Sequence, residues 1–121
     1  MSQKKTIVTG GAGFIGSAIV WRLNELGHAD IIIVDRRDDA AKEKNLAPLK
    51  FTEFVDADEF IVRLDDFTGI DAIIHMGADS STTATDREWM MSNNYQYTLD
   101  LARFAVANDI RFIYASSAAT Y

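Results

Sequence analysis

Short runs of β-branched and aliphatic residues alternate along this chain with longer segments whose apolar residues recur at helical spacing. The short runs predict strands, because a strand buried on both faces of a sheet is apolar throughout. They lie at Thr6–Thr9, Ile31–Asp35, Asp71–His75 and Arg111–Ser116, with a weaker run near Phe51–Phe54. The longer segments predict helices over Phe14–Leu26, Asp56–Phe67 and Thr85–Asn108, the last being the longest, and a short charged helix within Asp38–Leu46.

This alternation predicts an α/β fold. Strands joined through helices by short connections pair in parallel with right-handed crossovers, which yields an open, doubly wound sheet. We expect five strands in the order 3-2-1-4-5 and one domain over residues 1–121, because a chain of 121 residues is short for two cores. Such sheets bind ligands beyond the carboxyl ends of the strands where the winding reverses, here between the first and the fourth strand.

Composition narrows the classes of partner. Twelve basic and eighteen acidic residues give a net charge of −6, which argues against nucleic acid or an anionic membrane surface. The sequence holds no cysteine, Met1–Lys5 lacks the apolar core of a signal peptide, and the longest aliphatic run, Ile31–Val34, is too short to cross a bilayer. We therefore expect a soluble, cytoplasmic protein. His28 and His75 have no carboxylate at metal-ligand spacing, so we expect no metal site.

A glycine-rich turn joins the first strand to the first helix. In "TGGAGFIG", Gly10, Gly13 and Gly16 form a G-x-x-G-x-x-G frame, and Gly11 in place of Gly10 gives a G-x-G-x-x-G frame. Glycines permit a tight turn and the approach of a pyrophosphate, whose charge the start of the helix favours. Asp35 ends the second strand nineteen residues after Gly16, where an acid binds ribose hydroxyls. The pattern predicts a Rossmann-type dinucleotide-binding domain.

The segment "DRRDD" leaves the choice of dinucleotide open. Asp35 by itself favours NAD, whereas Arg36 and Arg37 are suited to neutralise the 2′-phosphate of NADP, and Lys42 adds to that charge. The same segment is also typical of a solvated turn with mixed charges. From the residues alone, both dinucleotides remain candidates.

Three motifs at predicted strand ends, "TGGAGFIG", "HMGADSSTT" and "SSAATY", resemble those of the extended short-chain dehydrogenase/reductase superfamily. Within it, "SSTT" together with "MMSNNYQYT" is similar to the ADP-glyceromanno-heptose 6-epimerases, and the similarity runs from Thr6 to Tyr121. The resemblance implies an isomerase that inverts C6 of an ADP-activated heptose through a transient ketone, in lipopolysaccharide core synthesis. It also implies NADP as cofactor, with NAD as the alternative, and a homo-oligomer at full length.

The resemblance further implies roles for individual residues. Ser117 corresponds to the hydroxyl that hydrogen-bonds the reacting sugar oxygen, and is the catalytic candidate. The implied cofactor-binding residues are Gly10, Gly13, Phe14, Ile15, Gly16, Asp35, Arg36, Lys42, Met76, Gly77, Ala78, Asp79, Ser80 and Asn93. Ala57 stands where the family has a lysine that contacts the cofactor, which departs from the pattern. Without the resemblance, capping of the following helix is the favoured role of Ser80 and the hydroxyl residues after it.

The pair that transfers the proton in this family, Tyr-x-x-x-Lys, does not occur in the sequence. The chain resembles about the first two-fifths of such an enzyme, so we expect the C-terminal part of the fold and the substrate domain to be missing, and apolar sheet surface to be exposed. We expect the chain alone to be inactive. Two alternatives remain: another NAD(P)-dependent nucleotide-sugar epimerase or dehydratase, and a non-catalytic dinucleotide-binding module.

Overall fold

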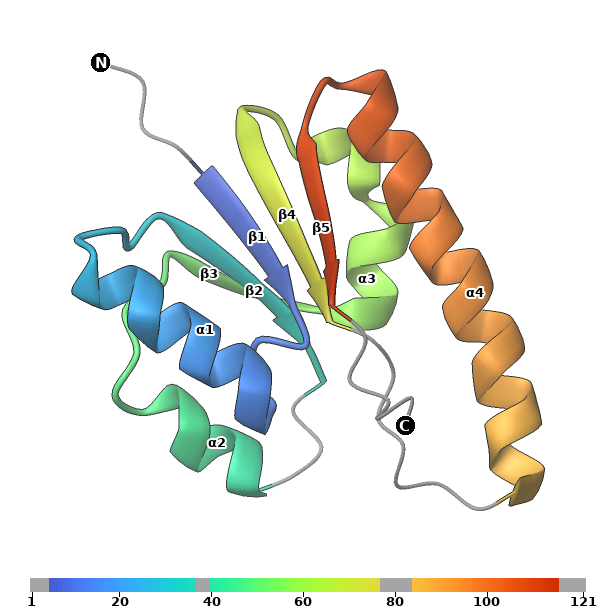
Figure 1. Cartoon of the computed structure of the whole chain (residues 1–121), viewed down its shortest axis with the longest axis horizontal. Coiled ribbons are helices and arrows are strands. Elements are labelled where there is room, and N and C mark those ends of the chain that lie inside the picture. The colour runs from blue at the N-terminus through green and yellow to red at the C-terminus, as the bar shows by residue number, and fades with distance from the viewer. Residues whose placement is uncertain (1–4, 37–39, 77–83, 116–121) are drawn as a thin grey trace.

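A parallel sheet with helices on both faces forms the protein (Figure 1). The computed structural model describes residues 5–36, 40–76 and 84–115, and for residues 41, 84–95 and 115 it describes the backbone only. Its elements, in chain order, are β1 (Lys5–Thr9), α1 (Phe14–Glu25), β2 (Ile31–Asp35), α2 (Ala40–Leu46), β3 (Glu53–Asp56), α3 (Ala57–Val62), the 3₁₀ turn η1 (Leu64–Asp66), β4 (Ile70–Met76), α4 (Ala84–Ala107) and β5 (Arg111–Ala115).

The strands follow the order β3-β2-β1-β4-β5, which confirms the predicted sheet. Every neighbouring pair is parallel, and Ile7 of β1 lies between Ile32 of β2 and Ile73 of β4. The chain runs from β1 outward to β3 and then returns to β4 on the other side of β1. The winding therefore reverses between β1 and β4, and the carboxyl ends of β1, β2 and β4 lie side by side.

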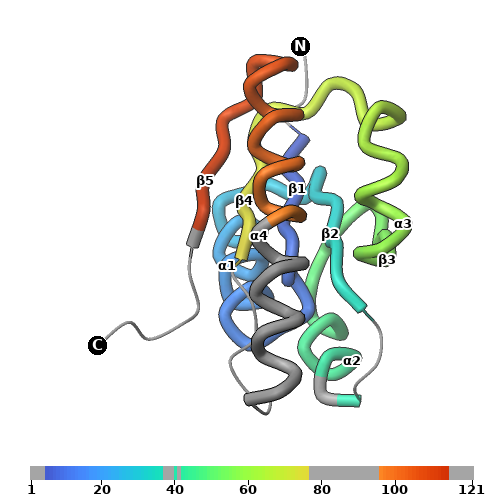
Figure 2. The backbone as a smooth tube through the Cα atoms, turned by 90° about the vertical axis from the view of Figure 1, so that its right-hand side faces the viewer, coloured from blue at the N-terminus to red at the C-terminus, as the bar shows by residue number. Residues whose placement is uncertain are grey.

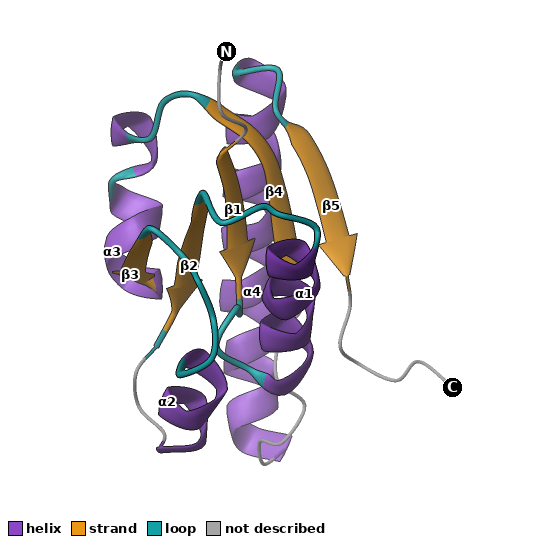
Figure 3. Cartoon of the chain, turned by 90° about the vertical axis from the view of Figure 1, so that its left-hand side faces the viewer, coloured by secondary structure: helices purple, strands orange, loops and turns teal. Residues whose placement is uncertain are grey.

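Two apolar cores, one on each face, hold the helices to the sheet. Successive strand residues point to opposite faces, so Ile7 enters the core under α3 and α4 while Val8 enters the core under α1 and α2. Figure 3 shows α1 and α2 in front of the sheet and α4 behind it. The strands β1 and β2 are buried on both faces, as the aliphatic run of β2 and the β-branched residues of β1 predict.

Two predicted boundaries were wrong in detail. The third strand begins at Glu53 rather than near Phe51, because the pairing with β2 starts at Ile32 and Glu53. The helix predicted over Asp56–Phe67 is two elements, since α3 ends at Val62 and a 3₁₀ turn follows. The break brings the Phe67 ring back to 5.1 Å from the Phe60 ring, so burial of Phe67 against the core outweighs continuation of the helix.

The fifth strand forms an edge of the sheet that the described helices cover incompletely. Ile113 pairs with Ile74 and therefore points to the same face, that of α1, yet 45% of Ile113 is exposed. In Figure 3, β5 lies beside α1 with no described helix in front of it. The expected exposure of apolar sheet surface is thus found among the described residues.

None of the helices in the described ranges is long and apolar enough to span a membrane.

Candidate functional site

The predicted glycine turn closes tightly on the end of β2. The Gly10 N–H donates to the Val34 carbonyl at 2.7 Å, and the Gly13 N–H donates to the Gly10 carbonyl at 3.1 Å. Gly10 has φ +70°, a backbone conformation that residues other than glycine rarely adopt. The turn therefore leaves β1 sharply and delivers the chain to the start of α1 at the carboxyl edge of the sheet.

Three of the glycines in this turn are required by the fold itself. A Cβ on Gly10 would lie 2.9 Å from the Cβ of Met76, and one on Gly11 would lie 2.9 Å from the Ile33 side chain. A Cβ on Gly16 would fall on the carbonyl oxygen of Gly10, so Gly16 lets α1 pack against the turn. These positions are explained without any ligand.

Gly13 is different, because nothing in the described structure forbids a side chain there. Its φ of −76° suits any residue, and the nearest atom to an added Cβ, the Gly10 carbonyl oxygen, is 3.4 Å away. Gly13 is the N-cap of α1, yet glycine supplies no capping side chain, and no side chain caps this helix in the described structure. A ligand that approaches the backbone closely gives a reason for glycine at this position.

The first turn of α1 offers N–H groups to such a ligand. The first N–H groups of a helix have no acceptor within the helix, and here no described side chain accepts from them. Phe14 and Ile15 open the helix with 84% and 51% of their surface exposed, so this end of α1 is accessible. The residues present therefore fit the pyrophosphate of a dinucleotide, whose anionic oxygens suit a helix N-terminus.

Asp35, at the end of β2, is bound to the glycine turn and to α2. Its Oδ2 accepts from the Ala12 N–H at 2.9 Å, and its Oδ1 accepts from the Arg36 N–H at 2.7 Å and from Lys42 Nζ at 3.0 Å. The side chains of this ion pair are 12% and 24% exposed. A carboxylate has about four acceptor positions. The contacts from the described residues thus leave an acceptor position on Oδ2 for a ribose hydroxyl.

The Arg36 side chain pairs with the start of α3 rather than with Asp35. Its guanidinium lies 2.9 Å from Oδ1 of Asp58, and both side chains are largely exposed. Asp58 follows Ala57, the residue that replaces the family's lysine, in the first turn of α3. The cation that pairs with Asp35 is therefore Lys42, and Arg37 lies outside the described residues.

His75 joins the ends of β1 and β4 to the middle of α4. Its Nδ1 lies 2.6 Å from the Thr9 hydroxyl and its Nε2 lies 2.8 Å from the Thr98 hydroxyl. The ring packs among those of Tyr97, Phe112 and Tyr114, with centroid distances of 5.5 to 6.0 Å. Burial lowers the pKa of His75 from 6.5 to about 4. Both ring nitrogens are therefore hydrogen-bonded near the carboxyl end of β4.

Several predicted site residues lie outside what the structure describes. Gly77, Ala78, Asp79, Ser80 and Ser117 are outside the described ranges, and of Asn93 only the backbone, within α4, is described. Their roles stay predictions. Met76, which precedes this segment, ends β4 beside the glycine turn, and its N–H donates to the Thr9 hydroxyl at 3.1 Å.

Sequence reasoning missed three polar residues that hold the site together. Asn45, on the same helix as Lys42, donates to the Ala12 carbonyl at 3.0 Å, so α2 also holds the glycine turn. Thr9 and Thr98 bind His75 from opposite sides. The one available signal was Thr9, a hydroxyl residue at the carboxyl end of β1. The partners of all three residues lie far away in the sequence.

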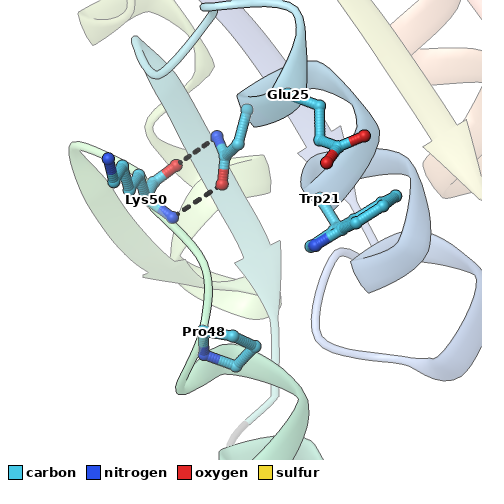
Figure 4. Close-up of a pocket in the computed structure, with 5 residues that line it drawn as sticks. Trp21, Glu25, Pro48 and Lys50 are labelled. Carbon is cyan, nitrogen blue, oxygen red and sulfur yellow. Dashed lines mark hydrogen bonds between the residues drawn. The ribbon is translucent and has the colours of Figure 1, made fainter.

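Two hollows in the described part of the structure lie away from this site. One, of about 170 Å³, lies between α1 and the loop before β3 and is lined by Trp21, Asn24, Glu25, Pro48 and Lys50 (Figure 4). A second, of about 480 Å³, is lined by Asp71, Asp109, Ile110 and Arg111 at the amino ends of β4 and β5. No candidate site residue lines either hollow. Within the described residues, no group of three or more histidine or acidic side chains is placed to hold a metal ion.

Comparison with solved structures finds the same fold in other proteins. ADP-L-glycero-D-manno-heptose-6-epimerase from Helicobacter pylori is 32% identical with a TM-score of 0.80, and the match covers 99% of this chain and 41% of that one. A UDP-glucose 4-epimerase is 27% identical with a TM-score of 0.72, over 98% and 37% of the two chains. The Bordetella bronchiseptica enzyme WbmG, solved with NAD and UDP, is 23% identical with a TM-score of 0.70, over 93% and 37%, and shows the fold alone.

The chain thus spans between 37% and 41% of the length of these three proteins. A comparison with family models gives a match over nearly the whole sequence, residues 6–121, to a family described as the NAD dependent epimerase/dehydratase family. The residues of the glycine turn and the acid at the end of β2 lie within this match. The chain therefore belongs to the NAD dependent epimerase/dehydratase family.

Proposed function

We propose that this chain is the dinucleotide-binding part of a nucleotide-sugar epimerase that inverts C6 of ADP-glycero-manno-heptose. The observation that carries the proposal is Gly13, the one glycine of the turn whose missing side chain the described fold does not require. The 32% identity with the Helicobacter pylori heptose epimerase supports the choice of sugar over the 4-epimerase alternative. The setting we propose is cytoplasmic lipopolysaccharide core synthesis by a homo-oligomeric full-length enzyme.

We propose NADP as the cofactor, with NAD as the alternative. A nicotinamide dinucleotide supplies reversible hydride transfer, so the sugar carbon is oxidised and then reduced on its other face without net redox change. The N–H groups at the start of α1 bind the pyrophosphate, and Asp35 accepts from the adenosine ribose. Lys42, 3.0 Å from Asp35, offsets the carboxylate charge that would otherwise repel a 2′-phosphate.

Ser117 is proposed to donate a hydrogen bond to the reacting oxygen of the sugar, which would orient C6 toward the nicotinamide. No Tyr-x-x-x-Lys pair is present in these 121 residues to take up and return the hydroxyl proton. We therefore expect the chain by itself to bind the dinucleotide without epimerising the sugar. An epimerisation assay with ADP-activated heptose checks this, and turnover above the buffer rate would contradict the requirement for that pair.

The glycine turn provides the sharpest test of cofactor binding. Gly13→Ala adds a methyl group that the fold accommodates, so the free energy of unfolding should change by less than about 1 kcal/mol. The same methyl group lies on the path of the pyrophosphate, so the Kd for NADP should rise about tenfold or more. Isothermal titration calorimetry and urea unfolding measure the two effects separately.

Gly16→Ala is the matched control for this test. Its methyl group would meet the Gly10 carbonyl, so unfolding should become easier even when no ligand is added. If Gly13→Ala binds NADP as the unaltered protein does, the turn does not hold a pyrophosphate and the proposal fails. Absence of NADP and NAD binding in the unaltered protein would be equally decisive against it.

A further inference from the structure

Three elements meet at the His75 side chain. Thr9 comes from the end of β1, His75 from the end of β4, and Thr98 from α4. The imidazole lies between the two hydroxyls, at 2.6 Å from Thr9 and 2.8 Å from Thr98, and His75 is only 7% exposed. Both ring nitrogens are therefore hydrogen-bonded where the winding of the sheet reverses.

The direction of these hydrogen bonds follows from Thr9. Its oxygen already accepts from the Met76 N–H at 3.1 Å, and among the described residues the acceptor available to its own proton is Nδ1 of His75. A neutral imidazole that accepts at Nδ1 carries its proton at Nε2. His75 consequently donates from Nε2 to the Thr98 hydroxyl.

The ring is neutral at physiological pH. Aromatic rings of Tyr97, Phe112 and Tyr114 surround it, and burial lowers its pKa to about 4. A charged imidazole would have to donate from both nitrogens, which would oblige Thr9 to give up its role as donor. Thr9 is only 4% exposed, so its proton needs Nδ1 as its acceptor, whereas Thr98 is half-buried and its own proton can reach water. The tautomer with the proton on Nε2 is thus the form that satisfies all four groups.

The residue next to Thr98 makes a second contact from the same turn of α4. Tyr97 donates from its hydroxyl to the Ala57 carbonyl at 3.1 Å, and burial raises the pKa of this hydroxyl, so it stays a donor. Ala57 begins α3 directly after β3. Two adjacent residues thus attach α4 to the ends of β4 and β3, while α4 crosses the sheet in front of β1 and β4 (Figure 2).

We propose that His75 is a positioning residue, which fixes α4 through Thr98 so that the turn of α4 carrying Asn93 lies at a set distance from the glycine turn. Asn93 precedes Thr98 by five residues, about one and a half helical turns. Its effect on cofactor binding rests on the proposed function. The tautomer and the attachment of α4 stand on the contacts of His75 alone.

The test compares two threonines that each form a hydrogen bond with a histidine. Thr98, on α4, binds His75 near the carboxyl edge of the sheet, and Thr6 binds His28 near the amino edge. Thr98→Val removes the acceptor of His75 and keeps the shape of the side chain, so the Kd of the intact protein for NADP should rise about three- to tenfold. Thr6→Val breaks a similar bond, 2.9 Å between the Thr6 hydroxyl and His28 Nε2, at the amino end of β1. It should leave the Kd unchanged, and Thr98→Ser, which restores a hydroxyl, should restore the Kd.

Equal effects of Thr98→Val and Thr6→Val on the Kd, or failure of Thr98→Ser to restore it, would overturn the positioning role. A second readout needs no cofactor: long-range ¹H–¹⁵N spectra of histidine-labelled protein should show His75 with a bare Nδ1 and a protonated Nε2 at neutral pH. With two histidines in the sequence, a His28→Gln variant assigns the signals. A protonated Nδ1 would overturn the proposal, whereas absent NADP binding with the expected tautomer would refute only the proposed function.

Discussion

Asp35 accepts three hydrogen bonds, and each of them fixes a different part of the site. The Ala12 N–H belongs to the glycine turn, the Arg36 N–H belongs to the loop after β2, and the Lys42 amine belongs to α2. Together these three donors tie the carboxylate to the turn, to the loop and to α2. At this residue, therefore, one side chain both shapes the turn and presents an acceptor to a ribose.

Lys42 is expected to decide between the two dinucleotides. Lys42→Met removes the charge beside Asp35, so the Kd for NADP should rise about tenfold or more while the Kd for NAD changes much less. Lys44→Met, on the same helix but exposed, is the control for loss of one positive charge. Parallel calorimetric titrations with NADP and NAD measure the ratio. An unchanged ratio in Lys42→Met would show that Lys42 does not face a 2′-phosphate.

His75 is expected to make the folded protein less stable in mild acid. Its pKa is lowered from 6.5 to about 4, so between these values the unfolded chain binds a proton that the folded chain does not. The free energy of unfolding should therefore fall as the pH drops from 6.5 toward 4, by about 3 kcal/mol in all. Urea unfolding at a series of pH values measures it. His75→Gln, which cannot titrate, should lack this component; equal pH dependence in both proteins would contradict the assignment.

At the scale of elements, the ends of helices explain where the sequence-based predictions held and where they did not. The helix α1 ends at Glu25 and Gly27 follows with φ +86°, as expected of a glycine that stops a helix. The Asp56 side chain accepts from the Asp58 N–H and so caps α3. The break after Val62 had no local signal, because it follows from the packing of Phe67 against Phe60.

Asn24 is expected to hold the end of α1 to the loop before β3. Its amide donates to the His28 carbonyl at 3.0 Å. It also donates to the Lys50 carbonyl at 2.9 Å and accepts from the Lys50 N–H at 2.8 Å, the two bonds drawn in Figure 4. Asn24→Ala should lower the free energy of unfolding by about 2 kcal/mol, since three backbone groups lose a partner. Glu25→Ala, an exposed neighbour, should change it by less than about 0.5 kcal/mol. Urea unfolding decides, and equal losses in the two variants would contradict this role.

At the scale of the whole molecule, the sheet is covered unevenly. The strands β1 and β2 are buried between two pairs of helices, whereas Ile113 on β5 and its neighbour Tyr114 are 45% and 53% exposed. Parallel sheets normally have helices over both faces, because both are apolar. The exposed surface beside β5 is continuous with the core under α1 through Ile74, which pairs with Ile113.

This surface should make the 121-residue chain bind apolar dyes. Ile113→Ser should reduce the fluorescence of the dye anilinonaphthalene sulfonate and reduce self-association, because it interrupts a flat apolar surface. Val106→Ser is the control, since Val106 is 82% exposed but lies on α4, which covers the other face of the sheet. Dye titration and light scattering measure both effects. An equal response in the two variants would show that the face beside β5 is not special.

The amino-acid sequence alone determined the alternation of strands and helices and the place of the glycine turn, because apolar periodicity and glycine chemistry act between near neighbours. The order of the strands then followed from the winding rules of such sheets. Only the tertiary structure decided which partners complete the site. Ala12 meets Asp35 across 23 residues and Thr9 meets His75 across 66, and no local pattern encodes such pairs. The structure also distinguished Gly13, which has room for a side chain, from the glycines that the fold requires. The space around a missing Cβ depends on atoms that the sheet brings together.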